Sequence, residues 1–334
     1  MKGEKAKKIL YVFLHMKKTG GTTFAHHIEK NLRPGEFLWF FRYYGDYERV
    51  SNRTELKTKI LSLSQRQRDK LKIIGGHSIY YGIDEWLPER DVRYVAFLRE
   101  PIGRTISNYN FFRTRINHPH NDEQAEIFRR FVMDAGRARN FNETLDYCAV
   151  LSNNMFKFLA DHVYDTYTDE SVAEPYVDQL KNQEILNKLK AVLDKFYFIG
   201  LTERSDSDLL FLYGKLGIKK FFADQNISRK FFQLGPDDNA MLKKIEEKNG
   251  LDRQLYDYAA GLNGKFRKVN IGYPVIVSRA KARRAIYKFL HPLKHREWTF
   301  IDLLYQLSAA LKKRSRRYSR LVAAIKNVPP QPLN

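Results

Sequence analysis

Cysteine is almost missing from this 334-residue chain, which contains only Cys148. A single cysteine cannot form a disulfide within the chain, so we expect a reducing compartment. Long hydrophobic runs are missing as well, because no apolar stretch approaches the roughly 20 residues of a membrane-spanning helix. The apolar run after the basic N-terminus, Ile9–Leu14, has the length of one buried strand and not that of a signal peptide. These absences predict a cytoplasmic protein.

Acidic residues are scarce relative to basic ones, and the formal net charge is +21. Most of the excess lies in residues 265–334, where seventeen Lys and Arg stand against Glu297 and Asp302. Residues 1–264 are far closer to neutral. A chain of 43% hydrophobic residues has enough apolar surface to pack a core. We therefore predict one domain, large enough for an enzyme, over 1–264 and a basic helical C-terminal appendage over 265–334.

The phosphate-binding motif of nucleotide triphosphatases, GxxxxGK[ST], is absent, because Lys18 precedes the glycines here instead of following them. The order is strand, K-T-G-G-T-T turn and a helix-compatible segment through Leu32. Such a turn exposes backbone N–H groups, and the helix N-terminus adds partial positive charge, so the segment can cradle one phosphate. Glycines at 20 and 21 let the backbone approach an anion, and hydroxyls at 22 and 23 can donate to it. A tight connection without a ligand explains the local pattern equally well.

A second stretch favours phosphate binding over a tight connection without a ligand. Arg93–Leu98 reads as a buried strand that runs into the helix-like segment Arg99–Arg113, with Pro101 suited to its first turn. Ligands of open α/β sheets bind beyond the C-terminal ends of the strands, so Arg99 and the Lys18 loop should converge there. Arginine and serine are apt donors for a second phosphate, which makes Arg99 and Ser107 candidates.

Both stretches resemble one family. His15–Phe24 is similar to the 5′-phosphosulfate loop of sulfotransferases, H-x-P-K-T-G-G-T-S-F, and Arg99–Tyr109 is similar to their 3′-phosphate motif, R-D-P-x-x-R-x-x-S-x-Y. The similarity is strongest to carbohydrate sulfotransferases of the heparan sulfate 2-O and 6-O type, which use 3′-phosphoadenosine 5′-phosphosulfate (PAPS). It extends in the family's order to about Tyr258. Lys17 stands in place of the family's proline, and Glu100 stands in place of its aspartate.

The resemblance implies an α/β fold, a P-loop-like three-layer sandwich with a mainly parallel central sheet flanked by helices. It also implies the residues that bind the cofactor PAPS: Lys17, Lys18, Thr19, Gly20, Gly21, Thr22, Thr23, Arg99, Ser107 and, in the Q-N-I-S-R-K segment, Ser228. Periodicity further predicts a strand over 196–201 and helices over 143–160, 177–193, 207–216 and 241–258. We expect the aromatic cluster of residues 37–47 to be core, with stacking on a sugar or adenine ring as the alternative.

His77 is the candidate general base. It follows the short apolar strand Ile73–Ile74, and it matches the G-H-x-x-aromatic motif whose histidine is the base of the 2-O-type enzymes. Histidine titrates in the range that proton transfer from a hydroxyl requires. The alternative is a structural histidine beside a Gly–Gly turn. Lys18 is the second predicted catalytic residue, and no set of His, Cys, Asp and Glu has the spacing of a metal site, so we predict no metal.

The resulting hypothesis is in-line sulfuryl transfer from PAPS to an acceptor hydroxyl, on a glycan that the positive charge allows to be acidic. A P-loop nucleotide kinase and a non-catalytic polyanion-binding protein on the same fold are the alternatives. We expect no nucleic-acid partner. The basic helix expected over about Phe300–Ile325 can lie on an anionic membrane, or it can pack its apolar face on the domain. The acceptor itself is left open, because acceptor pockets lie on variable loops.

Overall fold

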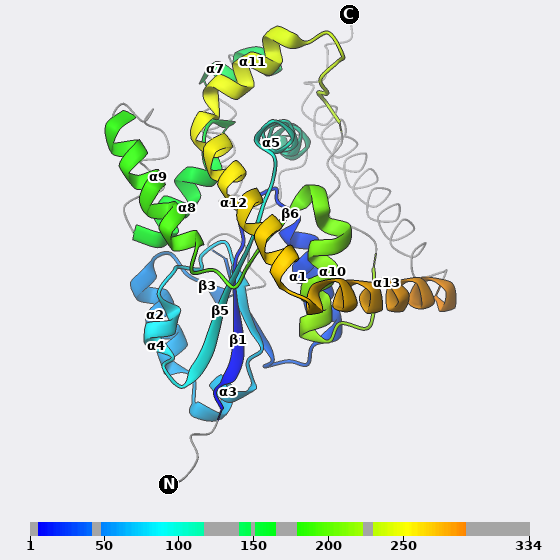
Figure 1. The fold of residues 1–334 in the computed structure, drawn as a ribbon. Coiled ribbons are helices and arrows are strands. Elements are labelled where there is room, and N and C mark those ends of the chain that lie inside the picture. The colour runs from blue at the N-terminus through cyan, green and yellow to red at the C-terminus, as the bar shows by residue number, and fades with distance from the viewer. Residues whose placement is uncertain are drawn as a thin grey trace, which may run out of the picture.

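A six-stranded parallel sheet forms the centre of the molecule (Figure 1). The structure is a computed structural model, and it describes residues 6–41, 48–116, 140–147, 151–164, 179–222 and 230–291. The strand order is β3-β2-β4-β1-β5-β6, and every neighbouring pair is parallel. The strands are β1 (Lys8–Leu14), β2 (Phe37–Phe41), β3 (Glu48–Arg49), β4 (Ile73–Gly76), β5 (Arg90–Leu98) and β6 (Phe198–Leu201).

Helices cover both faces of this sheet. They are α1 (Gly21–Asn31), α2 (Arg53–Ser62), α3 (Gln65–Lys70), α4 (Ile83–Trp86), α5 (Pro101–Ile116), α7 (Phe141–Tyr147), α8 (Asn154–Tyr164), α9 (Gln179–Leu193), α10 (Ser205–Leu216), α11 (Asn239–Lys248), α12 (Gly250–Val269) and α13 (Gly272–Leu290). One core joins the sheet to α2, α4, α8, α9 and α12, and a second core joins its other face to α1, α10 and α13. The predicted three-layer α/β sandwich is therefore confirmed.

The central strand β1 shows why the sequence gives two cores. Successive side chains of a strand point to opposite faces, so Leu10, Val12 and Leu14 enter one core while Tyr11 and Phe13 enter the other. All five are buried, which explains why this strand reads as a continuous apolar run.

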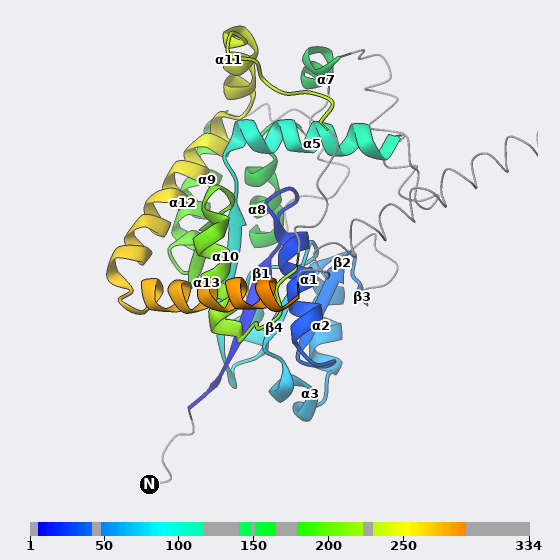
Figure 2. The same cartoon turned by 90° about the vertical axis from the view of Figure 1, so that its right-hand side faces the viewer.

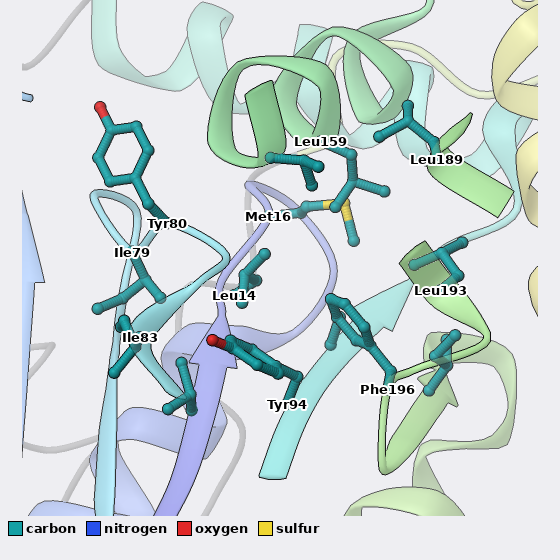
Figure 3. Close-up of a cluster of buried hydrophobic side chains, with 14 of the residues drawn as sticks. Leu14, Met16, Ile79, Tyr80, Ile83, Tyr94, Leu159, Leu189, Leu193 and Phe196 are labelled. Carbon is teal, nitrogen blue, oxygen red and sulfur yellow. The ribbon is translucent and has the colours of Figure 1, made fainter. Parts of the chain in front are cut away.

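The end of β1 that leads into the phosphate loop is anchored in the first core. Figure 3 shows Leu14 and Met16 among the side chains of Leu159, Leu193 and Phe196. Met16 is 1% exposed, although it already belongs to the loop. The loop therefore starts from a packed position and not from a free strand end.

The aromatic cluster is core where the structure describes it, since Trp39 is 3% and Phe40 2% exposed. The predicted helix over 177–193 is confirmed by α9, and the one over 207–216 by α10, which ends at the left-handed Gly217. The predicted strand over 196–201 forms as β6, two residues shorter.

Two predicted helices are wrong in the same way, because each is broken in the middle. The expected helix over 143–160 is divided into α7 and α8, and the one over 241–258 is divided between α11 and α12 near Asn249. The Asn153 side chain accepts from the N–H groups of Leu251 and Asp252 at the start of α12, at 3.0 and 3.1 Å.

In the reverse direction, the carboxylate of Asp252 in α12 accepts from the N–H groups of Met155 and Phe156 at the start of α8, at 3.1 and 2.8 Å. The two breaks thus create two helix N-termini that cap each other. A residue almost a hundred positions away supplies each cap, which periodicity cannot reveal.

The C-terminal part of the described chain packs on the sheet domain. Figures 1 and 2 show α13 lying against α10, where Tyr273 donates to buried Asp208 at 2.5 Å and Arg284 pairs with Asp206 at 2.9 Å. The predicted boundary after residue 264 falls inside α12, and the division of the chain stays a prediction. Residues 300–325, the expected basic helix, lie outside the described residues. Within the described ranges, the helices are too short or too polar to span a bilayer.

Candidate active site

The loop between β1 and α1 is held in shape by hydrogen bonds to its carbonyl groups. The Thr19 hydroxyl donates to Met16 O at 2.9 Å, Arg99 Nη1 donates to Lys18 O at 3.3 Å, and the Thr202 hydroxyl donates to Thr19 O at 3.1 Å. Carbonyl oxygens would repel an anion. Because these carbonyl oxygens accept hydrogen bonds from the protein itself, the N–H side of the loop is suited to a phosphate.

The two glycines of the loop have different roles. Gly20 adopts the left-handed φ of 86°, which favours glycine, and it has open space around it. Gly21 begins α1 in close contact with the ring of His15, where a Cβ would lie 2.0 Å from the imidazole. Gly20, the N-cap residue of α1, makes no side-chain cap, and the first turn contains no acidic residue. Its N–H groups, which lack acceptors within the helix, therefore suit a negatively charged ligand.

One face of α5 brings the two predicted phosphate sites together. Gly103, Ser107 and Phe111 are spaced by four residues and so lie along one side of the helix. At one end of this face, a Cβ on Gly103 would lie 3.7 Å from Arg99 Nε. At the other end, Lys18 Nζ lies 4.3 Å from the centroid of the Phe111 ring. Lys18, Ser107 and Arg99 thus follow one another along a single surface.

His77 comes directly after β4, at the same edge of the sheet. Its Nδ1 lies 2.6 Å from the carbonyl oxygen of His15, and the two imidazole rings stack with centroids 4.1 Å apart. A carbonyl can only accept, so Nδ1 carries a proton, and in the neutral ring the lone pair is on Nε2. Burial, together with the nearby His15 and Lys17, holds the pKa of His77 well below its usual value. His77 is therefore neutral at pH 7.

The family model described as the sulfotransferase family matches residues 5–259. The chain belongs to the sulfotransferase family. Its two phosphate motifs and His77 all fall inside the matched region, which confirms the resemblance drawn from them.

Curated relatives of this chain include heparan-sulfate 6-O-sulfotransferases. The zebrafish (Danio rerio) enzyme 1-A is 26% identical over 74% of this chain, and the mouse (Mus musculus) enzyme 3 is 27% identical over 75%. The chain spans 63% of the length of the first and 57% of the second.

Two solved structures are similar at low identity. A sulfotransferase from Alicyclobacillus acidocaldarius gives a TM-score of 0.36 at 11% identity, over 78% of this chain and 97% of that one. A mouse sulfotransferase complexed with PAP gives 0.25 at 12% identity, over 77% of this chain and 91% of that one. The fold assignment rests instead on the strand order and layers of this chain.

The chain departs from the family motifs at Lys17, Thr23 and Glu100, and Glu100 and Lys17 each have a defined environment in the structure. Glu100, in place of aspartate, accepts from the N–H groups of Ile102 and Gly103 at 3.1 and 2.8 Å and so caps α5. Arg253 pairs with the same carboxylate. Because Glu100 occupies the start of α5, the N–H groups of that helix end are not available to an anion, and only side chains could bind one there. Lys17, in place of proline, is exposed beside the loop.

The remaining predicted cofactor residues fall into three groups. Thr22 is exposed at the start of α1, whereas Thr23 is buried. Thr19 is buried with its hydroxyl directed to Met16, so only its backbone faces a ligand. Ser228 lies outside the described residues. Within the described ranges, no cluster of three or more His, Cys, Asp and Glu is placed to hold a metal ion.

Sequence reasoning missed three residues that shape this site. Thr202 follows β6 and holds the loop, Phe111 lies under the Lys18 ammonium, and the side chain of His162 in α8 meets the His77 carbonyl. The four-residue spacing from Ser107 to Phe111 was visible in the sequence. The other two contacts span more than eighty residues and carry no local signal.

Proposed function

We propose that this protein transfers a sulfuryl group from PAPS to a hydroxyl of a carbohydrate. The observation that carries the proposal is the alignment of Lys18, Ser107 and Arg99 along one face of α5, beside the uncapped start of α1. Two separate anion-binding groups at one sheet edge fit a nucleotide that has phosphates at both its 5′ and 3′ positions.

The first group suits the 5′-phosphosulfate. Lys18 would place its charge on the phosphate, and the N–H groups of Gly20–Thr23 would donate to its oxygens. The same groups stabilise the charge that grows on the leaving phosphate oxygen as the S–O bond breaks. Preorganised stabilisation of this kind is usually the largest single contribution to catalysis.

The second group suits the 3′-phosphate. The Arg99 guanidinium can bind two phosphate oxygens at once, and the Ser107 hydroxyl can donate to a third. Burial lowers the pKa of Arg99 from its usual value, but an arginine keeps its charge at any physiological pH. This pair is what would distinguish the donor from ATP or ADP.

His77 is the proposed base. Its Nε2 lone pair would take the acceptor's proton while the hydroxyl oxygen forms the new bond to sulfur. The hydrogen bond from Nδ1 to His15 O fixes the tautomer that this role needs. The names of the relatives support a glycan acceptor, and the net charge of +21 suits an acidic one. The single cysteine supports a cytoplasmic location.

The alternative of a polyanion-binding protein is favoured by one observation, the charge of α13, which contains five Lys and Arg and no acidic residue. A polyanion-binding function would leave the loop between β1 and α1, and His77, without a role. A kinase remains the weaker alternative, because the lysine stands before the glycines.

Calorimetric titration with 3′,5′-adenosine bisphosphate, ADP and AMP tests the proposal first. We expect clear preference for the bisphosphate, because only this ligand engages both groups. Turnover with PAPS and a desulfated heparan-type glycan would then establish the reaction. Equal or tighter binding of ADP would overturn the Arg99–Ser107 assignment and favour the kinase. Binding of no nucleotide would favour the polyanion-binding alternative.

A further inference from the structure

Both ring nitrogens of His162 meet carbonyl oxygens. In α8, its Nδ1 lies 2.7 Å from the oxygen of Phe158, one helical turn earlier, and its Nε2 lies 2.7 Å from the backbone oxygen of His77. Carbonyl oxygens only accept hydrogen bonds, so each nitrogen needs a proton of its own to make its contact. A neutral imidazole has only one N–H, and only an imidazolium satisfies both partners.

The surroundings of His162 favour this charge. Its ring stacks on Phe158, at 3.9 Å between centroids, and on Tyr80, at 5.0 Å, and aromatic faces attract a cation. The carboxylate of Asp161 lies 3.4 Å from Nδ1. The ionisable residues that contact His162 include Asp161 on its own helix and Tyr80 and His77 on the segment after β4, and His77 is neutral. With the side chain only 9% exposed, water cannot replace a lost partner.

His27 in α1 provides a matched contrast inside the same protein. Its Nδ1 also lies near a carbonyl one turn earlier, that of Thr23, at 2.8 Å. Its Nε2, however, accepts from the N–H of Phe222 at 3.0 Å. One proton therefore satisfies His27. The two histidines share a helical setting and a buried position, and they differ in what Nε2 faces.

We propose that His162 is a positively charged positioning residue that holds the His77 peptide in place for catalysis. The His77 ring is fixed at Nδ1 by the His15 carbonyl, and its backbone is fixed by the ring of His162. Two anchors on one residue define where Nε2 of His77 lies. The catalytic part of this inference rests on the proposed role of His77 as the base, whereas the charge of His162 stands on its own contacts.

A pH dependence follows from this arrangement. As pH rises, His162 loses its second proton, and one of its two carbonyl contacts turns into a repulsion between a lone pair and an oxygen. His77 is already neutral at pH 7 and does not change its charge as the pH rises further. Turnover should therefore fall on the alkaline side, while affinity for the nucleotide, bound by other residues, stays constant.

Nitrogen-15 NMR of the histidine rings in the full chain tests the charge without any assay of activity. At neutral pH, we expect both nitrogens of His162 to show imidazolium shifts, and His27 to show one protonated and one unprotonated nitrogen. A neutral pattern for His162 at pH 6–7 would overturn the proposal. Turnover of a His77→Ala variant tests the proposed base independently of this result.

Two substitutions test the positioning role. His162→Gln keeps an N–H donor near the Nε2 position without a titratable charge, so we expect near-normal turnover at neutral pH and no alkaline fall. His162→Leu removes the donor, and we expect kcat to fall by about 10- to 100-fold with unchanged bisphosphate binding. An alkaline fall that persists in the glutamine variant, or a leucine variant with the wild-type kcat and pH profile, would refute the role.

Discussion

The ammonium group of Lys18 lies over the ring of Phe111, 4.3 Å from its centroid. Lys18 has a backbone φ of 68°, in the left-handed region that residues other than glycine rarely adopt. The loop accepts this conformation, and the side chain is directed to the α5 face that also carries Ser107. The aromatic face holds the cation where the 5′-phosphosulfate is expected, so the charge is in place before the ligand arrives.

The first prediction concerns this pair. Lys18→Ala should lower kcat by roughly 100- to 1000-fold, as for loss of one transition-state donor. Phe111→Leu keeps the charge but loses the aromatic face, so its effect should be about tenfold or less. Steady-state kinetics with PAPS measures both. Lys215→Ala is the matched control, because Lys215 lies over Phe211 on α10, 5.6 Å from the ring centroid, away from the site. Full turnover by the Lys18 variant would contradict the assignment.

The second prediction concerns His77 as a base. His77→Ala should abolish transfer and leave bisphosphate binding near the wild-type level. Because the folded protein depresses the pKa of His77, the base is neutral at pH 7 and becomes protonated only well below pH 6.5. The acidic limb of kcat/KM should therefore lie below pH 6.5.

His26→Ala is the control for loss of a histidine whose pKa is also lowered, in this case to about 4, outside the proposed chemistry. Its turnover should be retained. A His77 variant with most of its turnover, or an acidic limb at pH 6.5 or above, would exclude His77 as the base.

Local patterns predicted the parts of this site that lie on single elements. The apolar run of β1, the glycine turn and the Arg99–Ser107 segment are each continuous in sequence, so their elements and order could be predicted. The hydrogen bond from Thr202 to Thr19 and the one from His162 to His77 join residues 183 and 85 positions apart. The geometry of these two hydrogen bonds depends on how the helices pack on the sheet, and the periodicity of the sequence does not predict that packing.

The third prediction separates the two phosphate sites. Ser107→Ala should weaken binding of 3′,5′-adenosine bisphosphate by roughly 10- to 100-fold, the usual loss for one hydrogen bond to a charged group. Binding of AMP should be unchanged, because AMP has no 3′-phosphate. Calorimetry measures both ligands on the same protein. Ser207→Ala on α10, whose hydroxyl donates to Arg204 O at 3.0 Å, is the control. Equal losses for the two ligands would place Ser107 outside the 3′-phosphate site.

The fourth prediction concerns the joint between α8 and α12. Arg104 of the 3′-phosphate motif is 1% exposed, donates to Asn154 and interacts electrostatically with fully buried Asp252. Burial raises the pKa of Asp252, and Arg104 opposes this rise. Asp252→Ala removes the acceptor of two helix N–H groups and leaves Arg104 without its counter-charge. The free energy of unfolding should fall by about 3–5 kcal/mol, measured by denaturant titration. Asp252→Asn, which keeps an acceptor, should lose less; a neutral alanine variant would contradict the cap.

The last prediction uses the contact between Gly21 and His15. A Cβ at Gly21 would lie 2.0 Å from the His15 ring, which stacks on His77 at 4.1 Å and on Phe13 at 5.3 Å. The ring cannot move without displacing the proposed base. Gly21→Ala should therefore reduce turnover by more than about tenfold and destabilise the fold by about 1–3 kcal/mol. Gly261→Ala, in open space on α12, should instead leave turnover intact and stabilise the helix by up to about 1 kcal/mol. If both variants kept full turnover, close approach at Gly21 would have no part in placing His77.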